Sequence, residues 1–371
     1  MGVRSKLDFK YMKKNRLFGL KFIKQSLIKL AWKPLTWLYS LVTSVRNLLY
    51  DTGLLRSFTA KQFTVVVGNL TVGGTGKTPM IEYLIRSFAR EFQLVTLSRG
   101  YGRETRGFRQ ASSQSTAREV GDEPLQYYEK FGKNCHVAVC EDRVKGAQIL
   151  AQQWPKHNLL LLDDAFQHRR LKADLYLLLN DFNRPFYEDE PFPGGRLRES
   201  RQGAGRADAV ICTKCPADLS PGKRIEIETA VGRYIRSGTP CFFSSIRYAS
   251  IRRFDEHIVQ PGGLFVLTGI AQPEPLLHYL QENYLVNGIK LFPDHHLFTE
   301  SDVLTVLKSV KNEELIVTTE KDLVKLRPLT QNLNLMHRFG YIAMEVDFGS
   351  DTGRFQEWLT LHVRTPMLTR S

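Results

Sequence analysis

Short apolar runs alternate with amphipathic stretches over the middle of the chain. The apolar runs lie at residues 63–67, 94–97, 136–140, 158–162, 175–179 and 209–212. The stretches between them carry helical patterns, at residues 80–88, 123–131, 143–154 and 223–235. Runs that are apolar throughout, and not at every second position, are typical of strands buried on both faces. The alternation therefore predicts a mostly parallel sheet with helices on both faces.

The same alternation restarts beyond about residue 245. Apolar runs at 264–269, 315–319 and 341–346 are separated by helical segments at 273–279 and 302–310. A chain of 371 residues has room for about two domains, so we expect a smaller second α/β lobe. With the distinct N-terminal segment described next, the predicted parts are residues 1–56, 57–248 and 249–371.

The N-terminal part is basic and amphipathic. Its first 33 residues carry ten basic side chains and a single acidic one. Apolar residues recur at helical spacing before and after Pro34, which predicts a pair of amphipathic helices on a membrane surface. The longest uncharged run, residues 34–45, is far shorter than the roughly 20 residues that a membrane span requires. Amphipathicity alone leaves open that these helices pack on the protein's own core.

The overall charge points to a polyanionic partner. The chain has 52 basic and 38 acidic residues, a net charge of +14. Much of the excess lies in the N-terminal part, and no recognition-helix, RNP or zinc-finger signature accompanies it, so we do not expect nucleic acid to bind. The five cysteines form no disulfide or zinc framework, which is typical of reduced thiols in a cytosolic setting.

A glycine-rich loop follows the run at residues 63–67. Strand, loop and helix in that order are the context of a phosphate-binding P-loop, so the predicted fold is α/β with a P-loop NTPase-like sheet. Backbone N–H groups of such a loop surround a polyphosphate, its lysine reaches the β and γ phosphates, and the next hydroxyl binds Mg²⁺. One position departs from G-x-x-x-x-G-K-[ST], since threonine replaces the first glycine. The predicted nucleotide-binding residues are Thr71, Gly73, Gly74, Thr75, Gly76, Lys77 and Thr78.

Two carboxylates follow a second apolar strand. Asp163 and Asp164 come directly after the run at 158–162. In a P-loop fold this is the position of the Walker B acid, which holds Mg²⁺ from the side opposite Thr78. A strand-end cap is the alternative interpretation of Asp163.

Three further polar, turn-rich clusters lie at residues 98–103, 120–124 and 292–296. Taken singly, each is typical of a solvated loop or a helix cap. On spacing alone none of them defines a catalytic site.

Together these segments carry a family resemblance. Residues from about 38 to 348 resemble the tetraacyldisaccharide 4′-kinases of lipid A biosynthesis, which are membrane-surface P-loop kinases. The ordered set of motifs is specific, whereas the P-loop alone is not. The matching segments are 46–51, 67–71, 77–79, 98–103, 121–124, 163–171, 197–199, 268–271, 292–296 and 319–322.

The resemblance implies a reaction and its catalytic residues. It implies transfer of the γ-phosphate of ATP to the 4′-hydroxyl of a tetraacyldisaccharide 1-phosphate. Asp122, paired with one histidine of the second lobe, would orient and deprotonate that hydroxyl. The sequence does not fix whether His295 or His296 faces Asp122, and we favour His295.

The resemblance also implies the ligands around the reaction. The cofactors would be ATP and Mg²⁺, with Thr78, Asp163, Asp164 and Glu199 as the metal environment. The enzyme would be peripheral at the cytoplasmic face of the inner membrane, bound to an anionic lipid surface, and no protein partner is implied. Candidates for the phosphates and the substrate headgroup are Arg99, Gln167, His168, Arg169, Arg170 and Arg198.

Two alternatives belong to other functional classes. A P-loop GTPase or metallochaperone would carry a base-reading [NT]-K-x-D, but residues 213–216 read Thr-Lys-Cys-Pro and lack the aspartate. A nucleic-acid-binding ATPase is suggested only by the net charge. The chain departs from the family at residues 194–196, where many relatives have Gly-Pro, and in its first 30 residues, which precede the usual family start.

Overall fold

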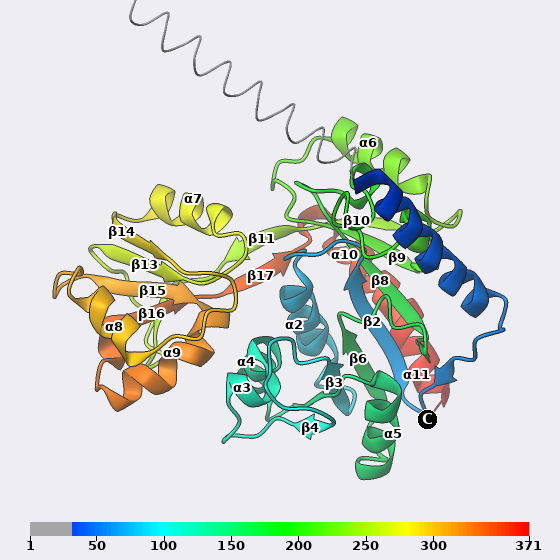
Figure 1. Cartoon of the computed structure of the whole chain (residues 1–371). Coiled ribbons are helices and arrows are strands. Elements are labelled where there is room, and N and C mark those ends of the chain that lie inside the picture. Colours follow the sequence, from blue (N-terminus) through cyan, green and yellow to red (C-terminus); the bar gives the residue numbers. More distant parts are fainter. Residues whose placement is uncertain (1–31, 371) are drawn as a thin grey trace, which may run out of the picture.

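The computed structural model describes residues 32–370 and folds them into two lobes (Figure 1). The larger first lobe is built on an eight-stranded sheet and the smaller second lobe on a five-stranded sheet. Strands β11 (Ser245–Tyr248) and β17 (Met344–Asp347) pair antiparallel and join the lobes. The chain thus enters and leaves the second lobe through one two-stranded connection.

The sheet of the first lobe has the strand order β10-β9-β8-β2-β6-β3-β5-β4, and only β4 runs antiparallel to its neighbour. The carboxyl ends of the parallel strands therefore lie at one edge, where ligands of open α/β sheets bind. The strands are β2 (Phe63–Asn69), β3 (Leu94–Ser98), β4 (Arg109–Gln110), β5 (Cys135–Val139), β6 (Leu159–Asp163), β8 (Leu175–Asp181), β9 (Ala209–Thr213) and β10 (Cys241–Phe243).

Helices cover both faces of this sheet, as the sequence predicts. Alternate residues of β2 belong to different cores: Val65 and Val67 pack in one core with Leu84 of α2, and Val66 packs in the other with Leu150 of α5. Every residue of β2 is buried, which explains its continuous apolar run. The helices are α2 (Lys77–Phe88), α3 (Ala117–Val120), α4 (Asp122–Phe131), α5 (Arg143–Gln153) and α6 (Pro221–Gly232), with short 3-10 turns η1 (Phe186–Glu188) and η2 (Arg201–Arg206).

The second lobe is also α/β. Its sheet has the order β12-β16-β15-β13-β14, with β12 antiparallel to β16 and the other pairs parallel. The strands are β12 (Arg252–Arg253), β13 (Leu264–Thr268), β14 (Val286–Leu291), β15 (Leu315–Thr319) and β16 (Phe339–Ile342), and the helices are α7 (Glu274–Asn283), α8 (Glu300–Leu307), α9 (Glu320–Asn332) and the 3-10 turn η3 (Met336–Arg338).

The C-terminal residues return to the first lobe. Phe355, Leu359, Val363 and Met367 pack in the same core as Phe88 of α2. The second lobe therefore ends near β17, although the sequence predicts that it extends over residues 249–371. The returning elements are η4 (Gly349–Asp351), α10 (Thr352–Leu359), the π-helix η5 (Thr360–Arg364) and α11 (Thr365–Arg370).

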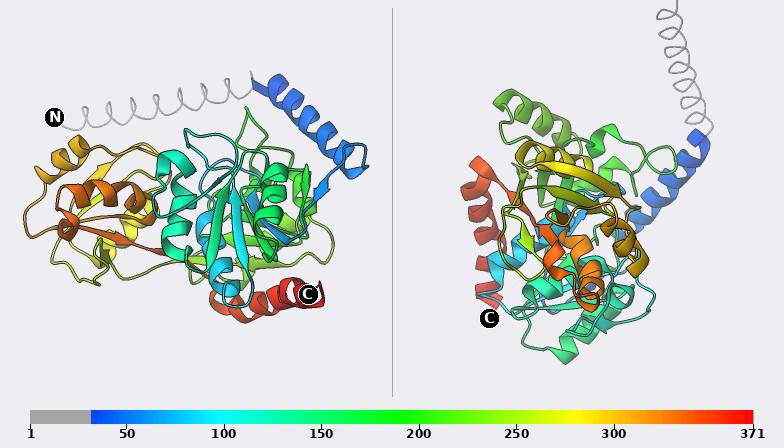
Figure 2. Two further views of the ribbon diagram at one scale, coloured as in Figure 1. Left: turned by 90° about the horizontal axis from the view of Figure 1, so that it is seen from below. Right: turned by 90° about the vertical axis from the view of Figure 1, so that its left-hand side faces the viewer.

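Residues 32–51 form a helix on the opposite side of the first lobe from α10 and α11 (Figure 2). The short strand β1 (Phe58–Thr59) follows it and pairs with β7 (Leu171–Lys172). No helix within residues 32–370 is both long enough and apolar enough to cross a bilayer. The helix predicted before Pro34 lies largely outside the described residues.

Candidate active site

The glycine-rich loop connects β2 to α2 as predicted. Gly73 has a φ of 116° and Gly76 a φ of 85°, backbone conformations that favour glycine. Thr71, which replaces the first glycine of the general motif, pairs with Leu197 in an antiparallel bridge. An extended, paired position does not require glycine, which explains why threonine can stand at position 71.

Two side chains at the end of β9 hold the outer side of this loop. Thr213 donates a hydrogen bond of 2.9 Å to the Thr75 carbonyl. Lys214 donates to the Gly74 carbonyl and also to Oε1 of Gln272, at 2.6 Å, from the second lobe. These bonds occupy two carbonyls of the loop and support the loop from outside.

Lys77 is held by a carboxylate and an amide. Its Nζ donates to Oδ1 of Asn69 at 3.3 Å and lies 3.6 Å from Oδ1 of Asp164. Asp164 also accepts a bond of 2.8 Å from Arg198. Burial raises the pKa of Asp164, but the charges of Lys77 and Arg198 outweigh it, and the pKa lies below its ordinary value. The φ of 51° at Asp164 is a strained conformation of the kind that clusters at functional sites.

Asp163 is buried with one oxygen unsatisfied. Its Oδ2 accepts a bond of 3.0 Å from Tyr127, whereas Oδ1 has no hydrogen-bond partner among the described residues. Burial first, then the charges of Glu123 and Asp164, raise the pKa of Asp163 to about 7. A buried carboxylate with a vacant oxygen is a position where a cation is stabilising.

The donor set around Asp163 fits Mg²⁺ shared with a nucleotide. Thr78, in the first turn of α2, donates a bond of 3.3 Å to Glu123, which also acts electrostatically on Asp163. Within residues 32–370 no group of three or more His, Cys, Asp or Glu side chains is arranged to hold a metal ion. Protein-bound Mg²⁺ commonly takes one or two carboxylates and completes its shell with phosphate oxygens and water. One carboxylate and one hydroxyl beside a phosphate loop suit that mode.

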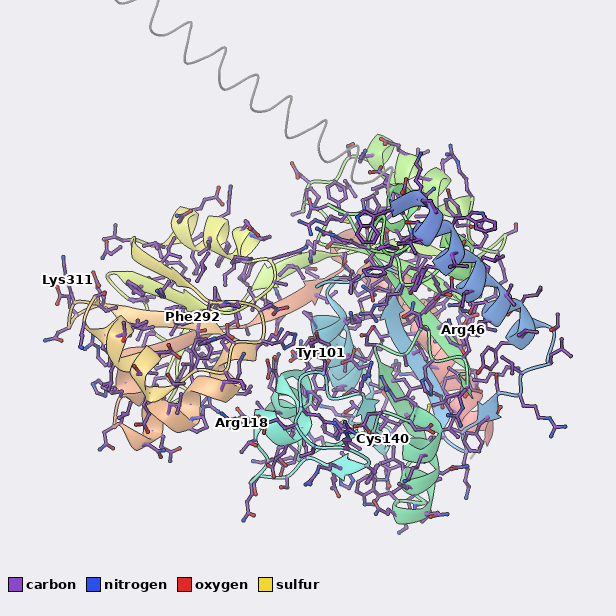
Figure 3. All side chains as sticks on the ribbon, in the orientation of Figure 1. Arg46, Tyr101, Arg118, Cys140, Phe292 and Lys311 are labelled. Atoms are coloured by element: carbon purple, nitrogen blue, oxygen red, sulfur yellow. The ribbon has the colours of Figure 1, made fainter. Side chains whose placement is uncertain are left out.

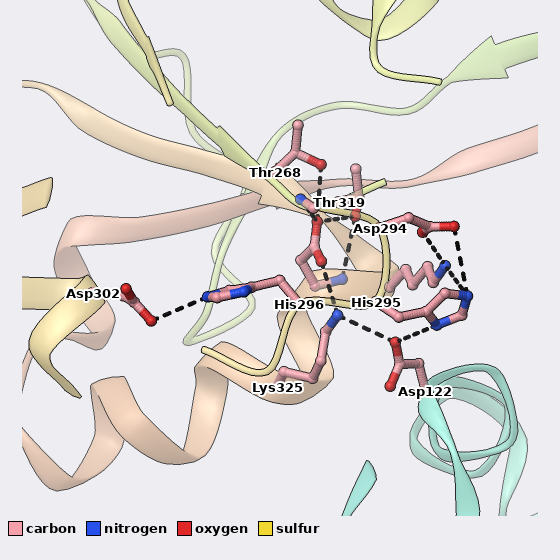
Figure 4. A network of polar contacts seen from close by, with 11 residues as sticks. Asp122, Thr268, Asp294, His295, His296, Asp302, Thr319 and Lys325 are labelled. Atoms are coloured by element: carbon pink, nitrogen blue, oxygen red, sulfur yellow. Dashed lines mark hydrogen bonds and ion pairs between the residues drawn. The ribbon is translucent and has the colours of Figure 1, made fainter. Parts of the chain in front are cut away.

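Asp122 and His295 meet across the two lobes (Figure 4). Asp122 begins α4 of the first lobe, and His295 follows β14 of the second. Their side chains approach to 3.1 Å, from Nδ1 to Oδ2. His296 instead contacts Asp302 at 3.1 Å and stacks on Phe292. The structure thus pairs His295, and not His296, with Asp122.

A buried lysine completes this pair and was not among the predicted residues. Lys325 of α9 donates to Oδ2 of Asp122 at 3.2 Å and lies 3.1 Å from Oδ1 of Asp322. Burial raises the pKa of Asp122, but the hydrogen bond from His295 and the charge of Lys325 outweigh it. The pKa of Asp122 therefore lies below its ordinary value, and the carboxylate is ionised at neutral pH.

A second lysine of α9, Lys321, reaches the far side of the imidazole. Its Nζ lies 3.2 Å from Nε2 of His295 and 2.9 Å from Asp294. Because an ammonium group can only donate, this contact favours the tautomer whose Nδ1 carries the proton toward Asp122.

A sequence signal could have located both lysines. Thr319 and Asp322 have the [ST]-x-x-[DE] spacing of a helix start, and Thr319 does cap α9 by accepting from the Asp322 N–H. A helix beginning there places Lys321 and Lys325 four residues apart on one face.

A loop of the first lobe faces this pair. Tyr101, which is 66% exposed, lies between the lobes (Figure 3), and its ring centroid is 5.0 Å from that of His295. Gly100 precedes it with a φ of 69°, and a Cβ there would lie 2.7 Å from the Val120 carbonyl. The glycine lets this loop pack closely against the turn that leads to α4.

The predicted headgroup arginines are only partly brought together. Arg169 and Arg170 already have carboxylate partners, Asp51 at 2.6 Å and Asp142 at 3.0 Å. Arg99 is exposed at the end of β3. Arg99 and Arg170 remain accessible from solvent, whereas Arg169 anchors the helix at residues 32–51.

Buried donors lie beside the predicted His168. Burial first, then the charge of Arg143, lowers the pKa of His168 to about 4, and its Nε2 has no partner among the described residues. Arg143, which was not among the predicted site residues, is 4% exposed and donates to the carbonyls of Cys140 and Glu141. Its Nε also has no partner in the described part of the chain. An unpaired buried guanidinium N–H suits an anionic ligand.

Glu199, predicted near the metal, has other partners. It is fully buried and accepts from Asn47 at 2.6 Å, from Gln167 at 3.0 Å and from Arg206 at 2.6 Å. Three donors to one carboxylate make Glu199 a structural junction, so we do not assign it to the metal.

The fold and the site define a two-lobed P-loop protein built for phosphoryl transfer, with a phosphate loop in one lobe and an Asp–His pair between the lobes. The family model of the tetraacyldisaccharide-1-P 4′-kinases matches residues 28–364. The chain belongs to this family. The resemblance drawn from the sequence motifs is thereby confirmed.

Individual relatives agree with the family model. The tetraacyldisaccharide 4′-kinase of Cytophaga hutchinsonii is 41% identical over 349 residues, which cover 92% of this chain and 97% of that protein. That of Flavobacterium psychrophilum is 40% identical over 337 residues, 90% of this chain and 96% of that one. A crystal structure of LpxK from Aquifex aeolicus in complex with ATP matches with a TM-score of 0.72 and 25% identity, covering 90% of this chain and 99% of that chain.

Proposed function

We propose that this protein transfers the γ-phosphate of ATP to the 4′-hydroxyl of a tetraacyldisaccharide 1-phosphate, at the cytoplasmic surface of the membrane. The observation that carries the proposal is the Asp122–His295 hydrogen bond, which joins the lobe carrying the phosphate loop to the second lobe. Family membership also favours this reaction over the GTPase and nucleic-acid alternatives.

The phosphate loop and Lys77 bind the triphosphate of ATP. Lys77 now lies near Asp164, and a polyphosphate would compete with that carboxylate for the same ammonium group. Mg²⁺ would be held by Asp163 and Thr78, with Asp164 close by, and would neutralise charge on the transferring phosphoryl group. Arg198 bonds to Asp164, so it can keep that bond if the Asp164 side chain moves when ATP binds.

Asp122 acts on the acceptor hydroxyl. Phosphoryl transfer depends mainly on position and charge, so the group beside the hydroxyl needs to be an ionised acceptor more than a strong base. Asp122 meets this need because its pKa is below the ordinary value. His295 donates to Oδ2, and no hydrogen bond reaches Oδ1 within the described part of the chain, which leaves Oδ1 for the hydroxyl (Figure 4).

The anionic headgroup of the acceptor meets basic side chains at the same edge of the sheet. Arg99 and Arg170 are exposed there, and Arg143 offers a buried N–H and His168 a buried ring nitrogen, both without partners in the described part of the chain. Guanidinium groups match phosphate geometry, so we assign them to the 1-phosphate and the sugar oxygens.

The helix at residues 32–51 supports the membrane part of the proposal. Most of its apolar side chains face solvent: Trp37 is 68% exposed, Val42 59% and Leu48 58%. Its buried positions are polar, Thr43 and Asn47. A helix with its polar side on the protein and its apolar side outward is the reverse of one packed on its own core, and it suits the interface of a bilayer.

The test is product formation by the full chain. The protein is incubated with γ-labelled ATP, Mg²⁺ and the tetraacyldisaccharide 1-phosphate in mixed micelles, and the lipid is separated by chromatography. We expect label in the lipid with ATP, far less with GTP, and none with Lys77→Ala or Asp122→Ala. Unlabelled lipid with the unaltered protein would overturn the proposed reaction.

A further inference from the structure

Several hydrogen bonds join the helix at residues 32–51 to the rest of the protein, beside an edge-to-face contact between the rings of Tyr39 and Phe192. Thr36 accepts a bond of 2.9 Å from the Gly194 N–H, and Tyr39 donates one of 2.8 Å to the Arg198 carbonyl. A Cβ at Gly194 would lie 2.6 Å from the Thr36 hydroxyl, so the glycine is what allows this approach. No residue of this helix belongs to a hydrophobic core within residues 32–370, so these directional bonds contribute much of what seats it.

One further bond of this helix is buried. Asn47 is 9% exposed, and its Nδ2 donates to Oε2 of Glu199, which is fully buried, at 2.6 Å. A short hydrogen bond to a buried carboxylate is charge-assisted and sensitive to displacement. A displacement of the helix would therefore displace the Glu199 carboxylate.

From Glu199 the chain of bonds continues to the P-loop lysine. Gln167 donates from one amide nitrogen to Oε1 of Glu199, at 3.0 Å, and to the Asn69 carbonyl, at 2.9 Å. The side chain of Asn69 then accepts from Lys77 at 3.3 Å. Five side chains, on four separate segments, therefore link the outward-facing helix to the lysine that meets the nucleotide.

The backbone beside Glu199 braces the same loop. The Arg198 N–H donates to the Leu70 carbonyl at 2.7 Å, and the Val72 N–H donates to the Arg196 carbonyl at 2.9 Å. Residues 196–198 hence form a short strand-like partner for the first turn of the P-loop. A shift of the helix that pulls on Glu199 would move this brace as well.

We propose that Asn47 is a positioning residue for Lys77, acting through Glu199, Gln167 and Asn69, so that the membrane-facing helix is coupled to the nucleotide site. The coupling rests on the proposed membrane binding of the helix. Lipid contact with its apolar side fixes the helix, the helix fixes Glu199, and the bonds from Glu199 hold Lys77 ready for the phosphates. By linkage, a nucleotide must then strengthen membrane binding by the same factor.

The experiment measures affinity for a fluorescent ATP analogue, in Mg²⁺, with and without vesicles of phosphatidylglycerol and phosphatidylethanolamine. For the unaltered full chain we expect vesicles to tighten nucleotide binding about 5-fold or more. Asn47→Asp sets two carboxylates against each other, so we expect this gain to vanish and nucleotide affinity without vesicles to fall about 10-fold.

A double variant and a matched control separate this role from mere stability. In Asn47→Asp with Glu199→Gln, the new amide at position 199 can donate to the new carboxylate and still accept from Gln167, so the coupling should return. Thr43→Val alters a buried polar residue of the same helix. Among residues 32–370 the Thr43 hydroxyl bonds only to the carbonyls of Tyr39 and Ser40, so this variant should keep the coupling.

Each outcome is decisive. Full coupling in Asn47→Asp, no coupling in the unaltered chain, or a double variant no better than the single one would overturn the role of Asn47. Coupling without labelled lipid in the transfer assay would sink the proposed reaction and leave the link standing. Labelled lipid without coupling would support the proposed reaction and overturn the link between the helix and the nucleotide site.

Discussion

Asp122 receives His295 and Lys325 on the same carboxylate oxygen, so Lys325 affects both its charge and its direction. We expect Lys325→Met to lower kcat about 10-fold or more with a smaller change in KM for ATP. The acidic limb of the pH–rate profile should move to higher pH, because Asp122 loses a charge that lowers its pKa. Steady-state rates from about pH 5 to about pH 9 test this. Lys325→Arg keeps the charge and should recover the profile; a profile left in place by Lys325→Met would contradict it.

The ionised carboxylate of Asp163 is expected to lower the stability of the folded protein while serving the transfer reaction. Its pKa is raised from an ordinary 3.8 to about 7, so the folded state holds its proton more tightly than the unfolded chain. The stabilisation this gives is present below about pH 4 and is lost as the pH rises through about 7. Asp163→Asn should therefore raise the Tm of the nucleotide-free, Mg²⁺-free protein by about 2 °C or more at about pH 8. Transfer should fall at the same time.

The comparison for Asp163 needs two pH values. Near pH 5 the wild-type carboxyl is already protonated, so the difference in Tm should shrink. A lower Tm for Asp163→Asn at about pH 8 would show that the ionised carboxylate stabilises the fold, contrary to the argument.

Single residues show what the sequence could and could not supply. Motif chemistry placed Lys77 and Thr78 correctly in the strand–loop–helix link, because that link is local. The partner of Thr71 could not be seen, since Leu197 lies 126 positions further along the chain. The surroundings of Glu199 were hidden for the same reason: its donors come from residues 47, 167 and 206.

At the scale of elements, the helix at residues 32–51 carries a prediction about lipid. Leu41 and Val45 are 44% and 46% exposed on its outer side. Leu41→Glu with Val45→Glu should abolish flotation with anionic vesicles, because each glutamate must enter the interface and repel anionic lipid. The control is Ile225→Glu with Leu361→Glu, which also introduces two glutamates, at sites 63% and 62% exposed elsewhere. Equal flotation of the two double variants would rule out this helix as the membrane contact.

Continuous apolar runs correctly predicted the buried strands, but they did not show where a run passes from one sheet to another. The run predicted at residues 341–346 is divided at Ala343 between β16, in the second sheet, and β17, which joins the lobes. Periodicity reports burial and not the identity of the neighbour, so it cannot show such a switch. Helix α9 was missed despite its capping signal, and Pro328 within it obscures the helical pattern.

The whole molecule is arranged so that the site exists only while the lobes are together. Asp122 lies on the first lobe, and His295 and Lys325 on the second. Away from this pair, Arg327 of α9 also bonds to Glu129 of α4 at 3.2 Å. An acceptor hydroxyl would meet an assembled Asp–His pair only in this arrangement. When the lobes part, the pair is separated, and this limits transfer of the γ-phosphate to water. A sequence shows each half of such a pair as an ordinary loop, because the pair is created by the lobe contact.

Lys214 joins the phosphate loop to the second lobe. Its Nζ bonds to the Gly74 carbonyl, to Asp181 at 2.7 Å and to Gln272 of the second lobe at 2.6 Å. Lys214→Met removes all three bonds, so KM for ATP should rise about 10-fold as the loop loses its outer support. Gln272→Leu removes only the bond between the lobes, so KM should stay within about 2-fold while kcat falls, because the second lobe is held less firmly over Asp122. Steady-state kinetics on both variants distinguish the two effects. Gln272→Leu could instead raise KM for ATP as much as Lys214→Met does and leave kcat intact. Lys214 would then support the loop only through the second lobe. The two lobes would cooperate in binding ATP but not in the transfer step.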